Sequence, residues 1–138
     1  LFIGSPLVED GIVSRSRLAQ GLGAMAAASP MPLAYLPHPR EDISAVTAML
    51  KPIAHIEPAP LPHGIADHVS AHGYRGYIAA VSTALLDLDA FDHSLFVPRL
   101  FGLERMHRAL AGWQANPVAL AAGETDLSQW LAATGDQK

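Results

Sequence analysis

The sequence predicts an α/β protein with an open, mainly parallel sheet and helices on both of its faces. Short apolar segments alternate five times with segments that have the apolar spacing of helices. This alternation is typical of parallel strands joined by crossover helices. The apolar segments are short and almost continuously apolar, so both faces of each strand are expected to be covered. The 138 residues have the size of one domain, and 50% of them are hydrophobic, which is enough for a substantial core.

Five apolar runs predict the strands, because each is bounded by glycine, proline or polar residues that end regular structure. The expected strands are residues 1–4, 33–36, 53–56, 76–81 and 93–97. The third of these ends at Glu57, and the fourth leads without a linker into Ser82 and Thr83. Since each connection carries a helical segment, parallel pairing is expected throughout.

The helices are predicted from apolar spacing and from their start and stop signals. Ser14 is expected to cap a helix that runs to about Ala28, and the carboxylates of Glu41 and Asp42 precede a second helix. Pro62 is expected to begin a third. The remaining helical segments are residues 84–88 and 104–114, with one or two further turns around Leu127.

Composition excludes several classes of function. The net charge is −4 and the basic residues are scattered, so no footprint for nucleic acid or for an anionic surface is present. The chain has no cysteine, which excludes disulfides and thiolate zinc sites. It contains no apolar run of about 18 residues, so no transmembrane segment is expected.

Residues with reactive side chains follow the first four predicted strands at the same end. They are Glu9 and Asp10 after the first strand, His38 after the second, Glu57 after the third, and Ser82 with Thr83 after the fourth. The carboxyl ends of parallel strands lie along one edge of a sheet, and ligands bind there where the strand order reverses. A single ligand site is therefore expected at this edge.

His38 is flanked by Pro37 and Pro39, which restrict the backbone on both sides of it. Such a histidine is either aimed at a ligand or part of a stiff surface turn, and the octapeptide alone leaves both interpretations open. Ser82 and Thr83 are likewise open to two interpretations, a seat for a phosphate group or a simple helix cap. No glycine-rich phosphate loop and no dinucleotide fingerprint is present, so a dinucleotide or triphosphate is disfavoured.

Three of these motifs carry a resemblance to a known family. Glu9-Asp10-Gly11, His38-Pro39 and Ser82-Thr83 resemble, in order and spacing, the acidic, His-Pro and serine/threonine motifs of bacterial sialyltransferases. Residues 2–13, 35–41 and 77–88 look most like glycosyltransferase family 52, to which polysialyltransferases are related. The resemblance implies one half of a GT-B architecture, with residues 1–138 as the C-terminal, Rossmann-like, donor-nucleotide domain of a longer two-domain enzyme. This fragment is expected to be inactive alone.

The resemblance also implies roles for individual residues. Asp10 would be the general base for the acceptor hydroxyl, with Glu9 and Gly11 supporting it. His38, with Pro39, would stabilise or protonate the departing phosphate of cytidine monophosphate (CMP). Ser82 and Thr83 would bind that phosphate, and Glu57 would accept the ribose hydroxyls. Because Pro37 precedes His38, contacts to the cytosine base of CMP would have to come from backbone groups.

The implied reaction is transfer of sialic acid from CMP-sialic acid to a galactose-type hydroxyl of a bacterial surface glycan, such as lipooligosaccharide or capsule. No metal or other cofactor is expected. His68 and His72 have a spacing that can bind zinc, but surface histidines are common on such helices. The partners would be the CMP-sugar donor and a glycan acceptor held by the N-terminal domain, without nucleic acid, and a homodimer is left open. The implied location is the cytoplasm, including its inner-membrane surface.

Two alternatives stay open at this point. The chain could be a non-catalytic module of the same fold that binds a nucleotide or another phosphorylated ligand, in which case Asp10 is only a loop carboxylate. It could also be a transferase of the same fold that uses a different sugar donor. Selectivity for CMP over uridine and adenosine nucleotides would distinguish the module from the transferase.

Overall fold

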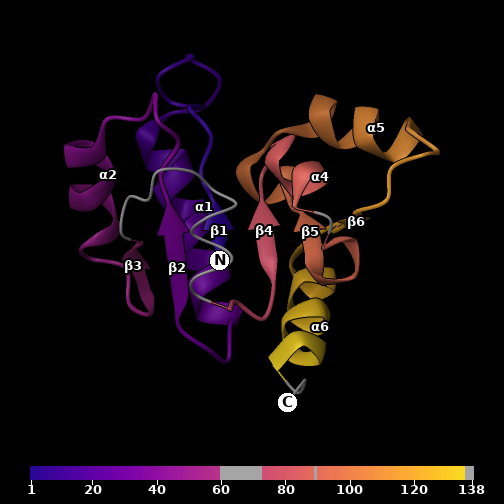
Figure 1. Ribbon diagram of the computed structural model, residues 1–138. Coiled ribbons are helices and arrows are strands. Elements are labelled where there is room, and N and C mark those ends of the chain that lie inside the picture. Colours follow the sequence, from indigo (N-terminus) through magenta and orange to yellow (C-terminus); the bar gives the residue numbers. More distant parts are fainter. Residues whose placement is uncertain (60–72, 89, 136–138) are drawn as a thin grey trace.

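The computed structural model describes residues 1–59, 73–88 and 90–135, and it confirms the open α/β fold. Within these residues six strands form one sheet in the order β3-β2-β1-β4-β5-β6, and every neighbouring pair is parallel (Figure 1). This is the strand order of the Rossmann fold. The chain begins in the middle of the sheet, moves outward to β3, and returns to the other side of β1 to form β4.

The strands are short and the helices differ in length. The strands are β1 (Phe2–Ile3), β2 (Leu33–Leu36), β3 (Ile56–Pro58), β4 (Tyr77–Ala79), β5 (Ser94–Phe96) and β6 (Ala119–Leu120). The α-helices are α1 (Arg15–Ala28), α2 (Ile43–Leu50), α4 (Ala84–Asp87), α5 (Glu104–Gly112) and α6 (Glu124–Gly135). Two 3-10 helices are η1 (Phe91–His93) and η2 (Pro98–Phe101). The helix expected after Pro62 lies outside the described residues. Across the described part, no helix combines the length and apolarity that a membrane span needs.

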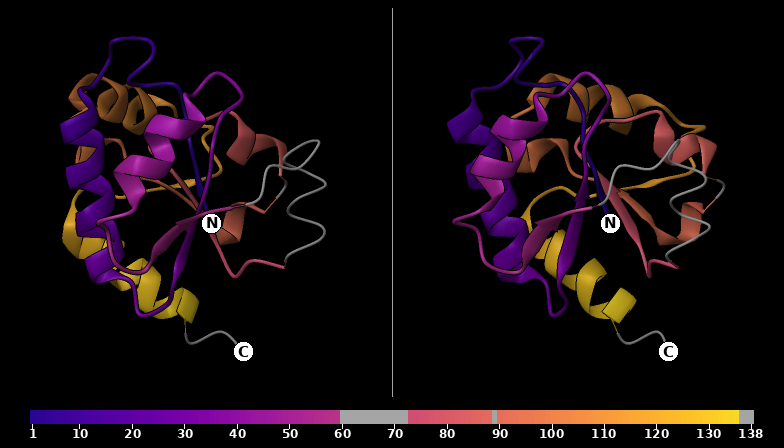
Figure 2. Two further views of the ribbon diagram at one scale, coloured as in Figure 1. Left: turned by 90° about the vertical axis from the view of Figure 1, so that its left-hand side faces the viewer. Right: turned by 60° about the vertical axis from the view of Figure 1, so that its left-hand side comes forward.

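Side chains alternate between two apolar layers along the strands, as the period of two in a strand requires. One layer packs against α1, α2 and α6, and the other packs against α4 and part of α5. Figure 2 shows α1 and α2 on one side of the strands and α4 on the other. The first layer includes Phe2, Tyr35, Ile78 and Leu95, and the second includes Ile3, Leu36, Ala79 and Phe96. The prediction that helices cover both faces is therefore confirmed.

Helix starts follow the predicted signals for α1 and α2. Ser14 is the N-cap of α1, and its hydroxyl accepts a hydrogen bond from the backbone N–H of Arg17 at 3.0 Å. Asp42 is the N-cap of α2, and its carboxylate accepts from the backbone N–H of Ala45 at 3.1 Å. Both caps satisfy amide groups that have no partner within the helix.

The third strand begins at Ile56, so the predicted segment 53–56 was wrong by three residues. Residues 53–55 form a turn instead, in which the N–H of Ile53 bonds to the carbonyl of Leu50 at 2.9 Å and His55 has a positive φ of 67°. The strand continues through Glu57 to Pro58. Proline is tolerated there because β3 is an edge strand, where a missing N–H leaves no partner unsatisfied.

The sequence also predicted too little regular structure for the last part of the chain. Residues 119–120 form a sixth strand, in which Ala119 is paired with Leu95 of β5, whereas five strands were expected. A segment of two residues is too short to show a hydrophobic period. Pairing with β5 therefore determines that these residues form a strand. Instead of one or two turns, α6 has 12 residues, because Leu127 and Leu131 are buried against the core beside α1. The expected helix 104–114 ends at Gly112.

Gly4, directly after β1, allows the closest approach between the first two strand ends. Its N–H donates to the carbonyl of Leu36 at 2.8 Å. A Cβ atom at this position would overlap Oε1 of Glu41 and would lie 2.9 Å from the hydroxyl oxygen of Tyr35. The missing side chain therefore makes room for a carboxylate from the loop that follows β2.

We predict that Gly4→Ala destabilises the fold by about 1 to 3 kcal/mol, the usual cost of overpacking a rigid site. The methyl group meets the carboxylate of Glu41, the hydroxyl of Tyr35 and the carbonyl of Leu36, and all three groups are held in place by hydrogen bonds. Gly23→Ala is the matched control, because its Cβ would meet nothing within 4 Å in the interior of α1. This control should stabilise by about 0.5 to 1 kcal/mol through helix propensity. Urea unfolding measures both, and equal effects of the same sign would contradict the packing explanation.

Candidate functional site

Three loops meet at the carboxyl edge of the sheet, where the strand order reverses between β1 and β4 (Figure 1). We call residues 5–13 the acidic loop, residues 37–42 the His-Pro loop, and residues 80–83 the Ser-Thr turn. The Ser5 hydroxyl donates to the carbonyl of Val81 at 2.8 Å, which joins the acidic loop to the Ser-Thr turn. Arg40 joins the His-Pro loop to Asp10 of the acidic loop. The edge thus brings together the three predicted motifs.

The His-Pro loop is held by a buried carboxylate, Glu41, which is only 5% exposed. Its Oε2 accepts from the hydroxyl of Tyr35 at 2.7 Å, and its Oε1 accepts from the backbone N–H of His38 at 2.9 Å. In return, the N–H of Glu41 donates to the carbonyl of His38 at 2.9 Å. These bonds close the loop between β2 and α2 into one conformation. Sequence reasoning treated Glu41 only as a residue preceding a helix and missed this function.

Burial dominates the electrostatics of Glu41. Desolvation raises the pKa of the Glu41 carboxyl above 4.5, and the nearby negative charge of Glu9 adds to the rise. Hydrogen bonds from His38 and Tyr35 and the charge of Arg15 act in the opposite direction. Burial also raises the pKa of Tyr35, and the charge of Glu41 reinforces the shift. Tyr35 therefore stays protonated and donates to the carboxylate.

The imidazole of His38 has one nitrogen engaged and one open. The backbone N–H of Arg40 donates to Nδ1 of His38 at 3.0 Å. Because Nδ1 accepts this bond, it carries no hydrogen, and the ring hydrogen is on Nε2. Within the described chain no residue forms a hydrogen bond with Nε2. The half-buried ring therefore presents an N–H donor to a ligand.

The acidic loop carries its two carboxylates in ion pairs. Both oxygens of Asp10 accept from the guanidinium of Arg40, at 2.9 and 3.1 Å. Glu9 accepts from Arg15 of α1 at 3.3 Å. Gly11 follows with a φ of 71°, a conformation that favours glycine, so it supports the turn rather than contributing a side-chain group. The sequence placed Asp10 at this edge but gave no sign that Arg40 would engage it.

The Ser-Thr turn departs from the expected seat for a phosphate. β4 ends at Ala79, so a short turn separates Ser82 and Thr83 from the strand, and α4 is a single turn of four residues. So short a helix offers little dipole to an anion. The Ser82 hydroxyl accepts from the N–H of Ala84 at 3.2 Å, and the exposed Thr83 makes no side-chain cap. A phosphate here would therefore depend on the two hydroxyl groups and on backbone N–H groups of the turn rather than on a helix dipole.

Two predicted residues lie at the margin of this arrangement. Glu57 is inside β3 and exposed, whereas it was expected directly after the strand. It is one strand beyond β2, and it forms no hydrogen bond or ion pair with the other candidate residues. Pro39 is exposed at the tip of the His-Pro loop, where it fixes the backbone beside His38.

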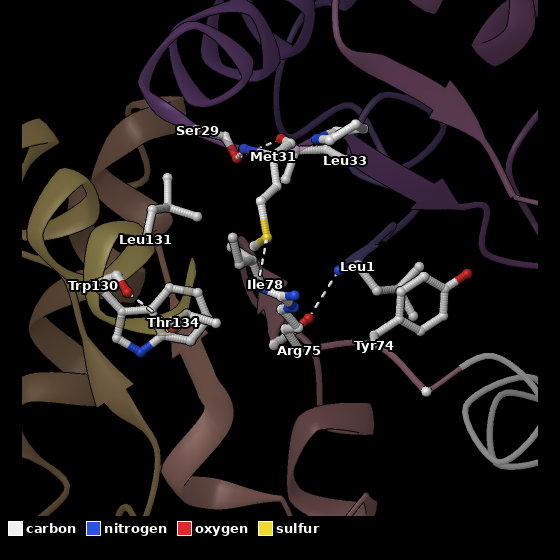
Figure 3. A pocket seen from close by; sticks show the side chains of 13 residues that line it. Leu1, Ser29, Met31, Leu33, Tyr74, Arg75, Ile78, Trp130, Leu131 and Thr134 are labelled. Carbon is white, nitrogen blue, oxygen red and sulfur yellow. Dashed lines mark hydrogen bonds between the residues drawn. The ribbon is translucent and has the colours of Figure 1, made fainter. Parts of the chain in front are cut away.

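The described residues contain no group of three or more histidine, aspartate or glutamate side chains that could hold a metal ion. His68 and His72, whose spacing in the sequence can bind zinc, lie outside those residues. A cavity of about 320 Å³ lies at the opposite edge of the sheet, lined by residues such as Leu1, Met31 and Trp130 (Figure 3). It contains none of the predicted site residues.

Comparison of the chain with family models, with curated proteins and with solved structures finds no match. Its function is therefore inferred from the chemistry of the carboxyl edge and from the resemblance of the three motifs. The chemistry consists of an open donor on His38, a carboxylate paired with an arginine, and two hydroxyl groups. Such a set can bind an anion and can move a proton.

We predict that Glu41→Gln changes how stability depends on pH. In the wild type the raised pKa means that the folded chain binds the proton more tightly than the unfolded chain. Wild-type stability relative to the variant should therefore rise as the pH falls from 7 toward 4.5, because protonation relieves the buried charge. Glutamine keeps the size of the side chain, and its oxygen can still accept from the N–H of His38, while its NH2 would donate to the hydroxyl oxygen of Tyr35 and so reverse that bond. Both proteins should therefore fold.

Urea unfolding of both proteins at pH 5 and pH 7 measures this difference. Glu104→Gln is the control, because Arg99 lowers the pKa of Glu104 through a hydrogen bond. The stability of the wild type relative to Glu104→Gln should therefore fall, not rise, when the pH is lowered. A stability difference between wild type and Glu41→Gln that is the same at both pH values would contradict the assignment.

Proposed function

We propose that the carboxyl edge binds CMP-sialic acid and that the chain is the donor-nucleotide domain of a sialyltransferase-like glycosyltransferase. The acceptor is a galactose-type hydroxyl of a bacterial surface glycan. One observation supports this above all: the acidic, His-Pro and Ser-Thr motifs meet at the switch point of the sheet, with Nε2–H of His38 open. Ligands of Rossmann-like sheets bind at this point.

The proposed reaction breaks the bond between the anomeric carbon of sialic acid and the phosphate oxygen of CMP. The acceptor oxygen forms a new bond to that carbon, and its proton passes to the carboxylate of Asp10. The electron pair of the broken bond stays on the CMP phosphate. Nε2–H of His38 and the hydroxyls of Ser82 and Thr83 donate hydrogen bonds to this growing negative charge.

His38 is proposed to stabilise the phosphate without protonating it. Its Nδ1 accepts a hydrogen bond from the N–H of Arg40, so Nε2 is the nitrogen left to donate to a phosphate. The second pKa of a phosphate monoester is about 6, so CMP can leave as the dianion near neutral pH. The role of the ring is therefore electrostatic.

A non-catalytic nucleotide-binding module is the second candidate. One observation favours it: both oxygens of Asp10 are bonded to Arg40, so in this conformation Asp10 has a structural partner and fewer lone pairs left for a base. Such a module would still bind a nucleotide through His38 and the Ser-Thr turn. It would show no catalytic dependence on Asp10 when supplied with an acceptor-binding domain.

We predict that the chain binds CMP in preference to uridine and adenosine monophosphates, and that His38→Ala weakens CMP binding by roughly 1.5 to 3 kcal/mol. This is the range for a hydrogen bond to a charged group. Titration calorimetry with and without a chelator measures both, and the chelator should have no effect. His93→Ala is the control, because the exposed His93 precedes β5 and lies at the other edge. Equal affinity for all three nucleotides, or an unchanged His38→Ala variant, would contradict the proposal.

A further inference from the structure

Arg40 contacts both residues to which the proposed function assigns the central chemistry. Its backbone N–H bonds to Nδ1 of His38 at 3.0 Å, and its guanidinium bonds to both oxygens of Asp10 at 2.9 and 3.1 Å. The backbone of Arg40 therefore orients the proposed phosphate donor while its side chain occupies the proposed base. The motif resemblance assigns no role to this residue.

The ion pair between Arg40 and Asp10 can be exchanged at low cost. The side chain of Arg40 is 62% exposed and that of Asp10 is 37% exposed. Exposed ion pairs contribute only about 0 to 1 kcal/mol, because water screens them and two side chains lose freedom. The phosphodiester of the donor offers the same planar guanidinium a bidentate partner of equal charge, and its negative charge grows as CMP leaves. A phosphate beside His38 would therefore compete effectively with Asp10 for Arg40.

The nearby arginine of α1 is less suited to this exchange. Arg15 is paired with Glu9 at 3.3 Å, and its Nη1 is buried without a hydrogen-bond partner. That nitrogen is closed to solvent in this conformation. Arg40 instead extends from the loop that carries His38, so its guanidinium can turn toward a phosphate without displacing an element of the fold.

We propose that Arg40 is a ligand of the donor phosphate and that its transfer from Asp10 to the phosphate releases the general base. While Arg40 is paired with Asp10, each carboxylate oxygen already accepts one hydrogen bond, so fewer of its lone pairs are available for the proton of an acceptor hydroxyl. Donor binding removes the guanidinium and leaves the carboxylate free. The base is thus most accessible when the donor is in place. This inference rests on the proposed function.

Exchange of Arg40 between Asp10 and the phosphate predicts a different effect on CMP binding from simple repulsion between Asp10 and the phosphate. If Asp10 competes with the phosphate for Arg40, removing the charge of Asp10 strengthens CMP binding only when Arg40 is present. If Asp10 merely repels the phosphate, the gain persists without Arg40 and becomes larger, because the carboxylate is then unpaired. A double-mutant cycle distinguishes the two cases.

The test is titration calorimetry with CMP on wild type, Asp10→Asn, Arg40→Met and the double variant. Arg40→Met should weaken binding about 10- to 100-fold, as loss of a charge-assisted contact does. Asp10→Asn should strengthen binding about two- to fivefold, the equivalent of an exposed ion pair. The double variant should bind like Arg40→Met. Arg40→Lys, which keeps the charge but loses the fork, should lie between wild type and Arg40→Met.

Arg105→Met, on the exposed face of α5, controls for the loss of one positive charge and should leave the affinity unchanged. Urea unfolding should give wild-type midpoints for the Arg40 variants, since the pair contributes little to stability. Wild-type affinity in Arg40→Met, or a gain from Asp10→Asn that is equal or larger when Arg40 is replaced by methionine, would overturn the exchange while leaving the proposed function intact. Failure of the wild type to bind CMP would overturn both.

Discussion

The His-Pro loop depends on one buried carboxylate. Glu41 bonds to the hydroxyl of Tyr35 and to the backbone of His38, and it lies against the bare Cα of Gly4. Tyr35 is itself fixed, since its ring stacks on Phe2 with 5.2 Å between centroids in the centre of the sheet. Burying a carboxylate costs free energy unless its oxygens have partners, and here both oxygens are bonded. The backbone of His38 is therefore tied to the rigid core.

The charged residues at the carboxyl edge differ in how deeply they are buried. Glu41 is enclosed and serves the structure, whereas Asp10 and Arg40 stand in solvent and can change partners. A buried and fully bonded carboxylate resists rearrangement because any movement leaves a charge unsatisfied. An exposed ion pair has no such penalty. The same edge thus combines a histidine held by the core with an exposed arginine, a combination suited to the anion binding proposed above.

Most of the fold was accessible from the sequence because its signals are local. The strand 33–36 was predicted with the bounds of β2, and Ser14 was identified as the cap of α1. Prediction failed where tertiary pairing decides the outcome. Residues 119–120 are too few to carry a period, and they form β6 only because β5 offers an unpaired edge. The strand at 53–56 was misplaced because an apolar residue can lie in a turn as well as in a strand. Ile53 lies in a turn, and Ile56 begins the strand.

The sequence by itself determined the fold class and the edge of the sheet at which Asp10, His38, Ser82 and Thr83 lie, because strand direction and chain order place loops without reference to side-chain contacts. Only the tertiary structure decided how these residues are engaged. The pairing of Asp10 with Arg40 joins residues 30 positions apart, and the burial of Glu41 depends on a glycine and a tyrosine from two other segments. Such contacts follow from the distances between elements, which no local pattern of residues encodes.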